Sequence, residues 1–244
     1  MVEGKFWLGT SGWTYPHWKG VFYPEEVARG RWLAYYSEQF DTVELNASFY
    51  HLPQRKTFVN WRAKTPPGFL FSVKGSRYIT HVKKLEGVEE PLARLLDAAS
   101  ALEEKLGPIL FQLPPQLKCD LNRLEKFLSL LPPGNRYAFE FRNPTFFCLE
   151  VYELLRQKQM SLCIADTPSY PKEEVVTASF VYLRLHGSQS LYTHCYEEEE
   201  LWEWGKKIKN WLSQGEVFCY FDNDYQGFAI KNAFRLREIV QEIE

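Results

Sequence analysis

Eight short segments rich in β-branched and aromatic residues recur along this chain, and they constrain its fold more than any other feature. Turn residues follow each segment, and a longer amphipathic stretch follows most of them. The eight segments are Lys5–Gly9, Thr42–Leu45, Phe69–Val73, Ile109–Leu113, Tyr137–Phe141, Ser161–Ala165, Val181–Leu185 and Val217–Phe221. We predict that each of them forms a β-strand.

Seven segments with the apolar spacing of amphipathic helices lie between or after these strands. They are Arg31–Phe40, Lys56–Lys64, Glu90–Leu106, Leu121–Leu131, Leu149–Lys158, Glu198–Ser213 and Asn232–Ile243. The proline-containing stretch between Asp166 and Val181 predicts at most a short helical turn. Strands that alternate with helices indicate a parallel sheet joined by crossover connections.

Eight such units fill the 244 residues, and about 250 residues is the usual size of a (β/α)₈ barrel. A doubly wound open sheet is the alternative, but it usually has fewer strands and a glycine-rich turn after the first one. The stretch from Gly9 to Gly12 lacks the spacing of that turn, and no repeat or linker divides the chain. We therefore predict an α/β fold, a single (β/α)₈ TIM barrel with a parallel eight-stranded core, formed by residues 1–244 as one domain.

Charge, cysteine content and hydropathy exclude several classes of protein. The net charge of −2 argues against a globally basic nucleic-acid binder, although a local basic patch remains compatible with it. None of the five cysteines forms a CxxC pair, so neither a zinc ribbon nor a disulfide framework is indicated. The first residues lack the features of a signal peptide, and no apolar run approaches the roughly 18 residues of a spanning helix. We expect a cytoplasmic protein that does not enter a membrane.

Polar residues close most of the predicted strands, and several of them share a face because side chains alternate along a strand. The pairs on one face are Glu44 with Asn46, Glu140 with Arg142, and Arg184 with His186. In a TIM barrel the active site lies at the C-terminal ends of the strands. Burying so many charges costs several kcal/mol each unless they are paired or used. We predict a functional pocket there, and a set of purely structural ion pairs is the alternative.

Three of these residues are candidate catalytic residues. Glu44 and Glu140 lie on strands far enough apart to face each other across the barrel mouth, and neighbouring cations would keep them ionised, as a general base requires. Glycosidases also use two carboxylates, but the sequence does not give their separation. His186 is an imidazole suited to proton transfer. A structural ion pair or hydrogen bond accounts for each residue equally well.

An anionic ligand is predicted from the basic residues near the same strand ends and from the loops after strands seven and eight, which often bind phosphate in this fold. Aromatic residues in the first two loops suit stacking on a sugar or base, or a lid over the barrel. The candidate ligand-binding residues are Trp13, Tyr15, Asn46, Tyr50, Lys74, Gln112, Arg142, Arg184, Asp222 and Asn223. Carboxylates and His186 are suitable metal donors, but no metal-binding motif occurs, so no metal ligand is assigned and the cofactor stays unknown.

Several motifs occur in a fixed order from one end of the chain to the other. They are GTSGWTYPHW (9–18), VELNASFYHLP (43–53), FSVK (71–74) with ITH (79–81), QLPP (112–115), FEFR (139–142), YLRLHG (182–187) and YFDND (220–224). Together they resemble the YecE-like family, catalogued as domain of unknown function 72. The resemblance implies a TIM barrel and no particular activity. The family commonly has a Ser-Trp pair where this chain has Asn143–Phe147, and a polar residue in place of Phe228, so no ligand contact is carried over to these two segments.

Three functional hypotheses follow from the sequence. The first is an enzyme, a hydrolase, lyase or isomerase, that acts on a phosphorylated or sugar-like small molecule. The second is a nucleic-acid-binding protein or a phosphodiesterase of the endonuclease type, by fold analogy, whose binding would weaken steeply with salt. The third is a non-catalytic binding protein. Stabilisation against heat by phosphosugars, nucleotides or metals would separate the third hypothesis from the others.

Overall fold

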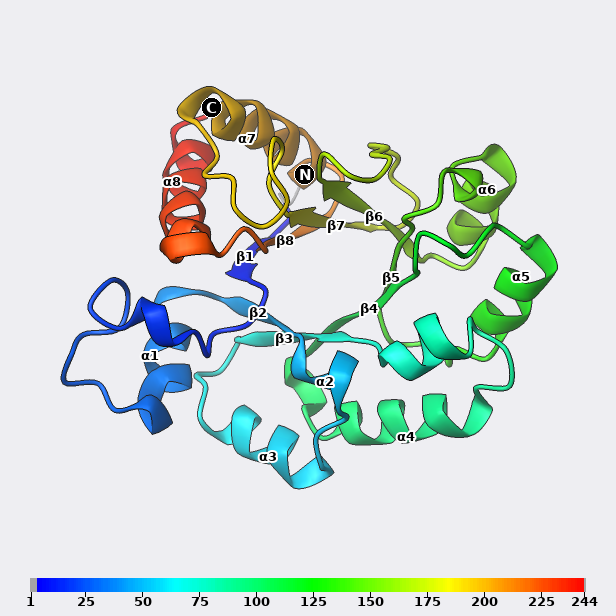
Figure 1. Ribbon diagram of the computed structural model, residues 1–244, viewed down its shortest axis with the longest axis horizontal. Helices are drawn as coiled ribbons and strands as arrows, with labels where there is room; N and C mark the ends of the chain where they lie inside the picture. The colour runs from blue at the N-terminus through cyan, green and yellow to red at the C-terminus, as the bar shows by residue number, and fades with distance from the viewer. Residues whose placement is uncertain (1–3, 244) are drawn as a thin grey trace.

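The computed structural model describes residues 4–243 and contains eight parallel strands that form a nearly closed barrel, with helices around its outside (Figure 1). The strands are β1 (Phe6–Thr10), β2 (Thr42–Leu45), β3 (Leu70–Lys74), β4 (Leu106–Gln112), β5 (Tyr137–Glu140), β6 (Ser161–Asp166), β7 (Phe180–Leu185) and β8 (Glu216–Phe221). The predicted α/β class and (β/α)₈ TIM barrel are confirmed. Met1–Glu3, part of the start judged to lack a signal peptide, lie outside the described residues.

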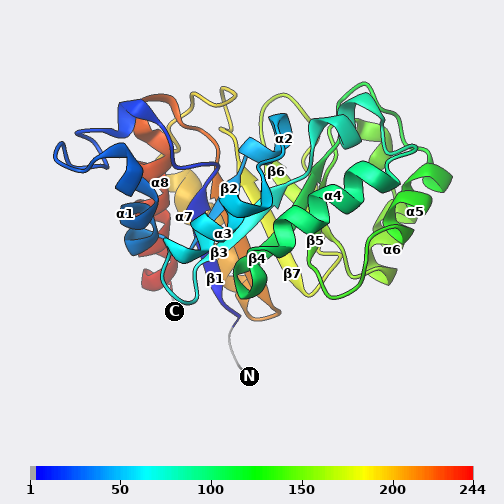
Figure 2. The same ribbon diagram turned by 90° about the horizontal axis from the view of Figure 1, so that it is seen from below.

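The helices cover the outer face of the sheet, and the long loops between strands and helices gather at one end of the barrel (Figure 2). The helices are α1 (Trp32–Gln39), α2 (Ala47–Tyr50), α3 (Arg55–Ala63), α4 (Glu89–Ser100), α5 (Leu121–Ser129), α6 (Leu149–Gln157), α7 (Glu198–Leu212) and α8 (Phe228–Glu242). Each predicted helix has a counterpart, and the connection between β6 and β7 has no helix. None of the helices within residues 4–243 is long and apolar enough to cross a membrane.

Three predicted boundaries are wrong by three residues or more: the end of α4, the start of β4, and the start of α8, which begins at Phe228 rather than at Asn232. The expected helix Glu90–Leu106 is too long, because α4 ends at Ser100 and Leu106 already belongs to β4. Glu103 has a left-handed backbone with φ of 50°, which a right-handed helix cannot continue through. The strand starts earlier than predicted because Gly107 permits a close approach to β3, where a Cβ would lie 3.1 Å from a carbonyl oxygen. The short helix α2 and a π-helical turn at Tyr78–Val82 were also not predicted.

Three layers of side chains fill the barrel interior, as expected for this fold. The layer at the N-terminal end of the strands is apolar and includes Trp7. Hydroxyl pairs make the middle layer: Ser72 Oγ lies 2.7 Å from Tyr182 OH, and Thr42 Oγ1 lies 2.8 Å from Tyr220 OH. The third layer, at the C-terminal end, consists of ionised groups. Because interior residues recur every second position, the same strands that build the apolar layer also position the charged one.

A tyrosine side chain closes the barrel where the sheet is least continuous. The strands β1 and β2 form no regular ladder, and one backbone bridge joins them at Ser11 and Glu44. The buried hydroxyl of Tyr36 spans this seam, because it accepts a hydrogen bond from Thr10 N at 2.9 Å and donates one to Thr42 O at 3.1 Å. The hydroxyl of Tyr36 therefore links β1 and β2 where no regular ladder of backbone hydrogen bonds joins them.

Replacing this hydroxyl should weaken the barrel. We expect Tyr36→Phe to lower the free energy of unfolding by about 1–3 kcal/mol, because the substitution leaves a buried amide and a buried carbonyl without partners. Denaturant titration measures the change. Tyr35→Phe, which removes a hydroxyl outside the seam, is the control and should change stability little. Equal losses for the two variants would show that the seam does not depend on Tyr36.

Candidate functional site

The guanidinium of Arg184, on β7, is the centre of the charged layer. It is fully buried and binds three carboxylates at once. Its Nε and Nη2 donate to the two oxygens of Glu44 at 2.9 and 2.7 Å. Its Nη1 donates to Glu140 Oε2 at 2.6 Å, and Nη2 also donates to Asp222 Oδ2 at 2.9 Å. The four strands that carry these residues are thereby joined across the barrel axis.

Glu44 is held entirely by neighbouring side chains. Besides Arg184, it accepts hydrogen bonds from Ser11 Oγ at 2.6 Å and from Tyr182 OH at 2.7 Å. The side chain is fully buried. The cation that keeps Glu44 ionised is Arg184, at which both carboxylate oxygens are directed, rather than Lys74 on the neighbouring strand. This arrangement suits a carboxylate that fixes the position of Arg184.

Glu140 is equally well satisfied. Its Oε1 accepts hydrogen bonds from Gln112 Nε2 and from Arg142 Nε, both at 2.8 Å, and its Oε2 accepts from Arg184. Burial alone would raise the pKa of Glu140, but Arg142 and Arg184 outweigh it and hold this pKa well below the usual range. The predicted face shared by Glu140 and Arg142 is therefore confirmed as an ion pair.

His186 links Arg184 to the carboxylate of Asp222. Arginine can only donate, so His186 Nε2, which lies 3.0 Å from Arg184 Nη1, must accept. The ring proton is then on Nδ1, which lies 3.0 Å from Asp222 Oδ2 at an angle too bent for a good hydrogen bond. Burial opposes ionisation of Asp222, but Arg184 and His186 hold its pKa at about 2. Asp222 is thus an anion at neutral pH.

A cavity of about 530 Å³ lies over this charged layer at the barrel mouth. Five predicted site residues line it, namely Tyr15, Asn46, Tyr50, Lys74 and Asp222. Five further lining residues were not among the candidates, namely His17, Tyr192, Thr193, Asp224 and Tyr225. Two of these residues could have been found from the sequence: Asp224 ends the same polar run as Asp222, and His17 lies in the aromatic first loop. Tyr192 and Thr193 lie in a loop with no such pattern.

The amino group of Lys74 is the most unusual group in the cavity lining. The side chain is 8% exposed, and within residues 4–243 its Nζ makes no hydrogen bond or ion pair. The amine forms a cation–π contact with Phe49, and its Nζ lies 4.6 Å from the centroid of that ring. Burial, reinforced by the positive charge of Arg184, lowers the pKa of Lys74 to about 8. A lysine in this state changes charge close to physiological pH.

Asp224 and His17 form an acid–base pair on the other side of the lining. Asp224 accepts a hydrogen bond from Trp18 Nε1 at 2.7 Å, and its second oxygen lies 2.9 Å from His17 Nε2. Burial raises the pKa of Asp224 to about 6, although Trp18 and His17 act in the opposite direction. A carboxyl group with this pKa can hold or release a proton at neutral pH, as a general acid or base must.

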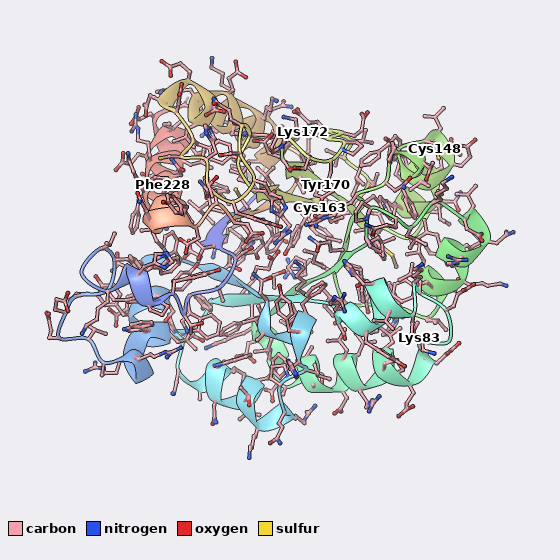
Figure 3. All side chains as sticks on the ribbon, in the orientation of Figure 1. Lys83, Cys148, Cys163, Tyr170, Lys172 and Phe228 are labelled. Atoms are coloured by element: carbon pink, nitrogen blue, oxygen red, sulfur yellow. The ribbon has the colours of Figure 1, made fainter. Side chains whose placement is uncertain are left out.

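Several cations lie beside Lys74. Burial, together with the charges of Arg142, Arg77 and Lys74, lowers the pKa of His81 to about 4. The ring of His81 packs edge-on against Phe49 at 5.2 Å. Arg142 also lies over the ring of Tyr170, 4.6 Å from its centroid, in the β6–β7 connection labelled in Figure 3. The mouth therefore carries a positive side, opposite in sign to Asp222 and Asp224.

Five predicted ligand-binding residues do not line this cavity: Gln112, Arg142 and Arg184 belong to the charged layer, and Trp13 and Asn223 lie elsewhere. Trp13 packs edge-on against Trp61, with ring centroids 5.4 Å apart, and lines a separate cavity. Asn223 is buried, and its Nδ2 donates to His194 O at 2.8 Å and to Asn232 Oδ1 at 2.9 Å. These contacts join the loop after β7 to α8, which is a positioning role.

The two segments that depart from the family pattern have structural roles. Asn143 accepts a hydrogen bond from Thr145 N and donates one to Pro115 O, and Phe146 stacks on Phe141 at 4.4 Å. Phe228 begins α8 and packs against Tyr225, with ring centroids 6.0 Å apart (Figure 3). Tyr225 lines the cavity, so Phe228 reaches the site through a neighbour.

The carboxylates at the barrel mouth bind an arginine side chain and are not arranged around a shared metal position. Within residues 4–243, no group of three or more His, Cys, Asp or Glu side chains is arranged to hold a metal ion. Glu44, Glu140 and Asp222 all converge on Arg184. No ligand set for a metal ion can therefore be named among residues 4–243.

An eight-stranded parallel barrel with a ligand-sized polar cavity over the ends of its strands defines a TIM-barrel protein whose candidate site lies where this fold carries out chemistry. The family model described as "Protein of unknown function DUF72" matches residues 7–244, and the chain belongs to this family. The resemblance seen in the sequence motifs is thus confirmed.

Related proteins match over most of their length. UPF0759 protein YunF of Bacillus subtilis (strain 168) is 25% identical, covering 96% of this chain and 94% of the relative. UPF0759 protein YecE of Escherichia coli (strain K12) is 26% identical, covering 84% and 81%. The crystal structure of the DUF72 family protein TM1631 from Thermotoga maritima has a TM-score of 0.88 at 30% identity, covering 97% of this chain and 99% of that one. A DUF72 family protein from Enterococcus faecalis, 20% identical with a TM-score of 0.84 over 97% and 95% of the two chains, shows the same fold.

Removing the guanidinium of Arg184 should lower the stability of the protein at pH 7, and the loss should be smaller at pH 5. We expect Arg184→Met to lower the free energy of unfolding at pH 7 by about 3–5 kcal/mol, because the carboxylates of Glu44, Glu140 and Asp222 lose their partner. In the wild type, the lowered pKa values of Glu140 and Asp222 contribute stability that is full above their ordinary values of 4.5 and 3.8 and is lost below them. In the variant, unpaired buried carboxylates bind protons more readily when folded, so the deficit should shrink from pH 7 to pH 5.

Denaturant titration at both pH values tests this expectation. Arg235→Met is the matched control, because Arg235 also contacts three carboxylates, those of Glu198, Glu238 and Glu242, but on the protein surface. The control should change stability little at either pH. A deficit for Arg184→Met that is no larger than that of the control would contradict the central role of Arg184.

Proposed function

We propose that this protein is an enzyme, a hydrolase, lyase or isomerase, that binds a small phosphorylated or sugar-like anion in the cavity at the barrel mouth. The observation that carries the proposal is Lys74, a largely buried side chain that lines the cavity and whose amine has no hydrogen-bond partner among the described residues. Burying a charged or polar group without a partner costs several kcal/mol. A ligand that supplies the missing partner accounts for this placement.

The anionic group of the ligand binds on the positive side of the mouth. Lys74 provides an ammonium group on the lining, and Arg142 and Arg77 lie beside His81, close to it. Charge-assisted hydrogen bonds from such donors are about twice as strong as neutral ones. The aromatic faces of Tyr15, Tyr50 and Tyr192 suit the apolar face of a sugar ring or of a short carbon chain.

Proton transfer is assigned to the Asp224–His17 pair, with His186 beneath it. This revises the part of the hypothesis that gave proton transfer to Glu44 and Glu140. Those two carboxylates are saturated by hydrogen bonds and fix Arg184, so they act as positioning residues. The pKa of about 6 for Asp224 lies nearer the operating pH than the lowered pKa of Glu140, which favours Asp224 as the acid.

A small molecule fits this site better than a nucleic-acid strand. The cavity has a volume of about 530 Å³, within the range of small-molecule sites. Its lining includes two carboxylates, Asp222 and Asp224, which repel a continuous phosphate backbone. The electrostatic contacts that dominate nucleic-acid binding are therefore weak here.

Stabilisation by anionic probes tests the proposal. We expect at least one of inorganic phosphate, glycerol phosphate, a phosphorylated pentose or hexose, and a uronic acid to raise the melting temperature of the wild type. At 100 times the dissociation constant, the stabilisation is about 2.7 kcal/mol. Lys74→Met should abolish the shift. Lys172→Met should retain it, because Lys172 is paired with Asp166 at 2.8 Å. If no probe shifts the wild type, or if both variants lose the shift equally, the proposal fails.

The affinity for such an anion should depend on pH in two steps. It should fall as the pH rises through about 6, because Asp224 becomes negative, and again through about 8, because Lys74 loses its charge. Asp224→Asn should remove the lower step and bind more tightly than the wild type at pH 7. Isothermal titration calorimetry at pH 5.5, 7 and 9 measures both effects. An affinity that rises with pH would contradict the assigned charges.

A further inference from the structure

The chain has two deeply buried lysines whose surroundings differ completely. Lys105 is 6% exposed, and its Nζ donates to Arg62 O, Thr65 O and Thr65 Oγ1, at 2.8, 2.6 and 3.1 Å. An ammonium group has three protons to donate, so Lys105 is fully satisfied as a cation. Lys74 is 8% exposed and has none of these partners. A buried lysine with a structural role is expected to have its amine hydrogen-bonded, as in Lys105. The amine of Lys74 is not, so its burial needs another explanation.

We propose that the Lys74 amine is a nucleophile that forms a Schiff base with an aldehyde or ketone carrying an anionic group. The inference rests on the proposed function, because it uses the same cavity and the same kind of small anion. The inference goes beyond the proposed function, because it names a carbonyl as the reacting group of the ligand and a covalent bond to Lys74 as the intermediate. A nucleophilic lysine requires a neutral amine, and a lysine that is desolvated or near another cation loses its proton readily.

Groups from every strand around Lys74 set its protonation. Glu44, Glu140 and Asp222 favour the charged form, whereas burial and Arg184 favour the neutral form, and their larger effect lowers the pKa of Lys74 to about 8. The three carboxylates are each committed to Arg184, which limits their ability to hold a proton on Lys74. On the side of the Tyr78–Val82 turn, His81 faces the same group of cations, and Phe49 covers the amine with an apolar ring.

The reaction balances with groups that the cavity provides. The neutral Nζ attacks the carbonyl carbon, a C–N bond forms, and one nitrogen proton moves to the former carbonyl oxygen to give a carbinolamine. The C–O bond then breaks, the hydroxyl takes one further proton from an acid and leaves as water, and the nitrogen lone pair forms the C=N bond of the iminium ion. Asp224, with a pKa of about 6, is the acid on the lining that can supply this proton. No oxidant or reductant is consumed.

Reductive trapping tests the inference with dihydroxyacetone phosphate as the probe. Sodium cyanoborohydride transfers hydride to the iminium carbon and fixes the adduct as a secondary amine. We expect one adduct per chain, heavier by the mass of the probe less one oxygen atom, and peptide mapping should place it on Lys74. Trapping should increase from pH 6 to pH 8 as the neutral amine forms. Glycerol phosphate, which has no carbonyl group, should compete with the probe and leave no adduct itself.

Two variants separate nucleophilicity from charge. Lys74→Arg keeps a cation in the cavity but has no nucleophilic amine, so it should lose the adduct while still being stabilised by glycerol phosphate. Lys172→Arg, which preserves the pair with Asp166, should be trapped like the wild type. The adduct should fall at least tenfold in Lys74→Arg relative to the wild type and to this control.

The outcomes also distinguish the inference from the proposed function. If glycerol phosphate stabilises the wild type but Lys74 carries no adduct, the Schiff base is overturned and anion binding stands. If adducts spread over exposed lysines while Lys74 stays unmodified, the inference is likewise overturned. If neither stabilisation nor an adduct is seen with any anionic probe, both proposals fail.

Discussion

The structure depends on one buried guanidinium that binds three carboxylates. Arg184 receives Glu44, Glu140 and Asp222 from three other strands, so the charged layer joins the barrel across its axis. A buried ion cluster of this kind is expensive to desolvate and adds little net stability, but its geometry is strict, because every donor has a fixed direction. Its effect is to fix the floor of the cavity. Gln112 on β4, Ser11 directly after β1, and Arg142, which follows Glu140 at the end of β5, complete this floor.

The layers beneath support the charged layer, because a single strand can contribute to more than one of them. On β7, for example, Phe180, Tyr182 and Arg184 belong in turn to the apolar, hydroxyl and charged layers. The hydroxyl layer is the transition between a dry core and an ionised rim, since Tyr182 bonds to Ser72 below and to Glu44 above. Fold and site are therefore not separable parts of this chain.

The period of two along each strand made the fold and the charged layer predictable from the sequence. Alternation placed Glu140 with Arg142 and Arg184 with His186, and the ion pair between the first two and the hydrogen bond between the second two bear this out. What could not be predicted was the choice of partner, because Lys74 ends the strand next to that of Glu44, yet Glu44 binds Arg184 from across the barrel, and only barrel closure decides. Asp224 and Tyr192 were missed as site residues for a related reason: loop conformation, not periodicity, brings them to the cavity.

The connection between β6 and β7 is the one place in the described part of the chain where no helix follows a strand. It crosses the rim as an irregular strap, in which Tyr170 meets Arg142 and Lys172 meets Asp166 (Figure 3). Because this connection contains no helix that must pack against the neighbouring helices, its length can change at small entropic cost. The strap can therefore vary in length between relatives and change what Arg142 and Asp166 contact, while the barrel that supports it stays the same.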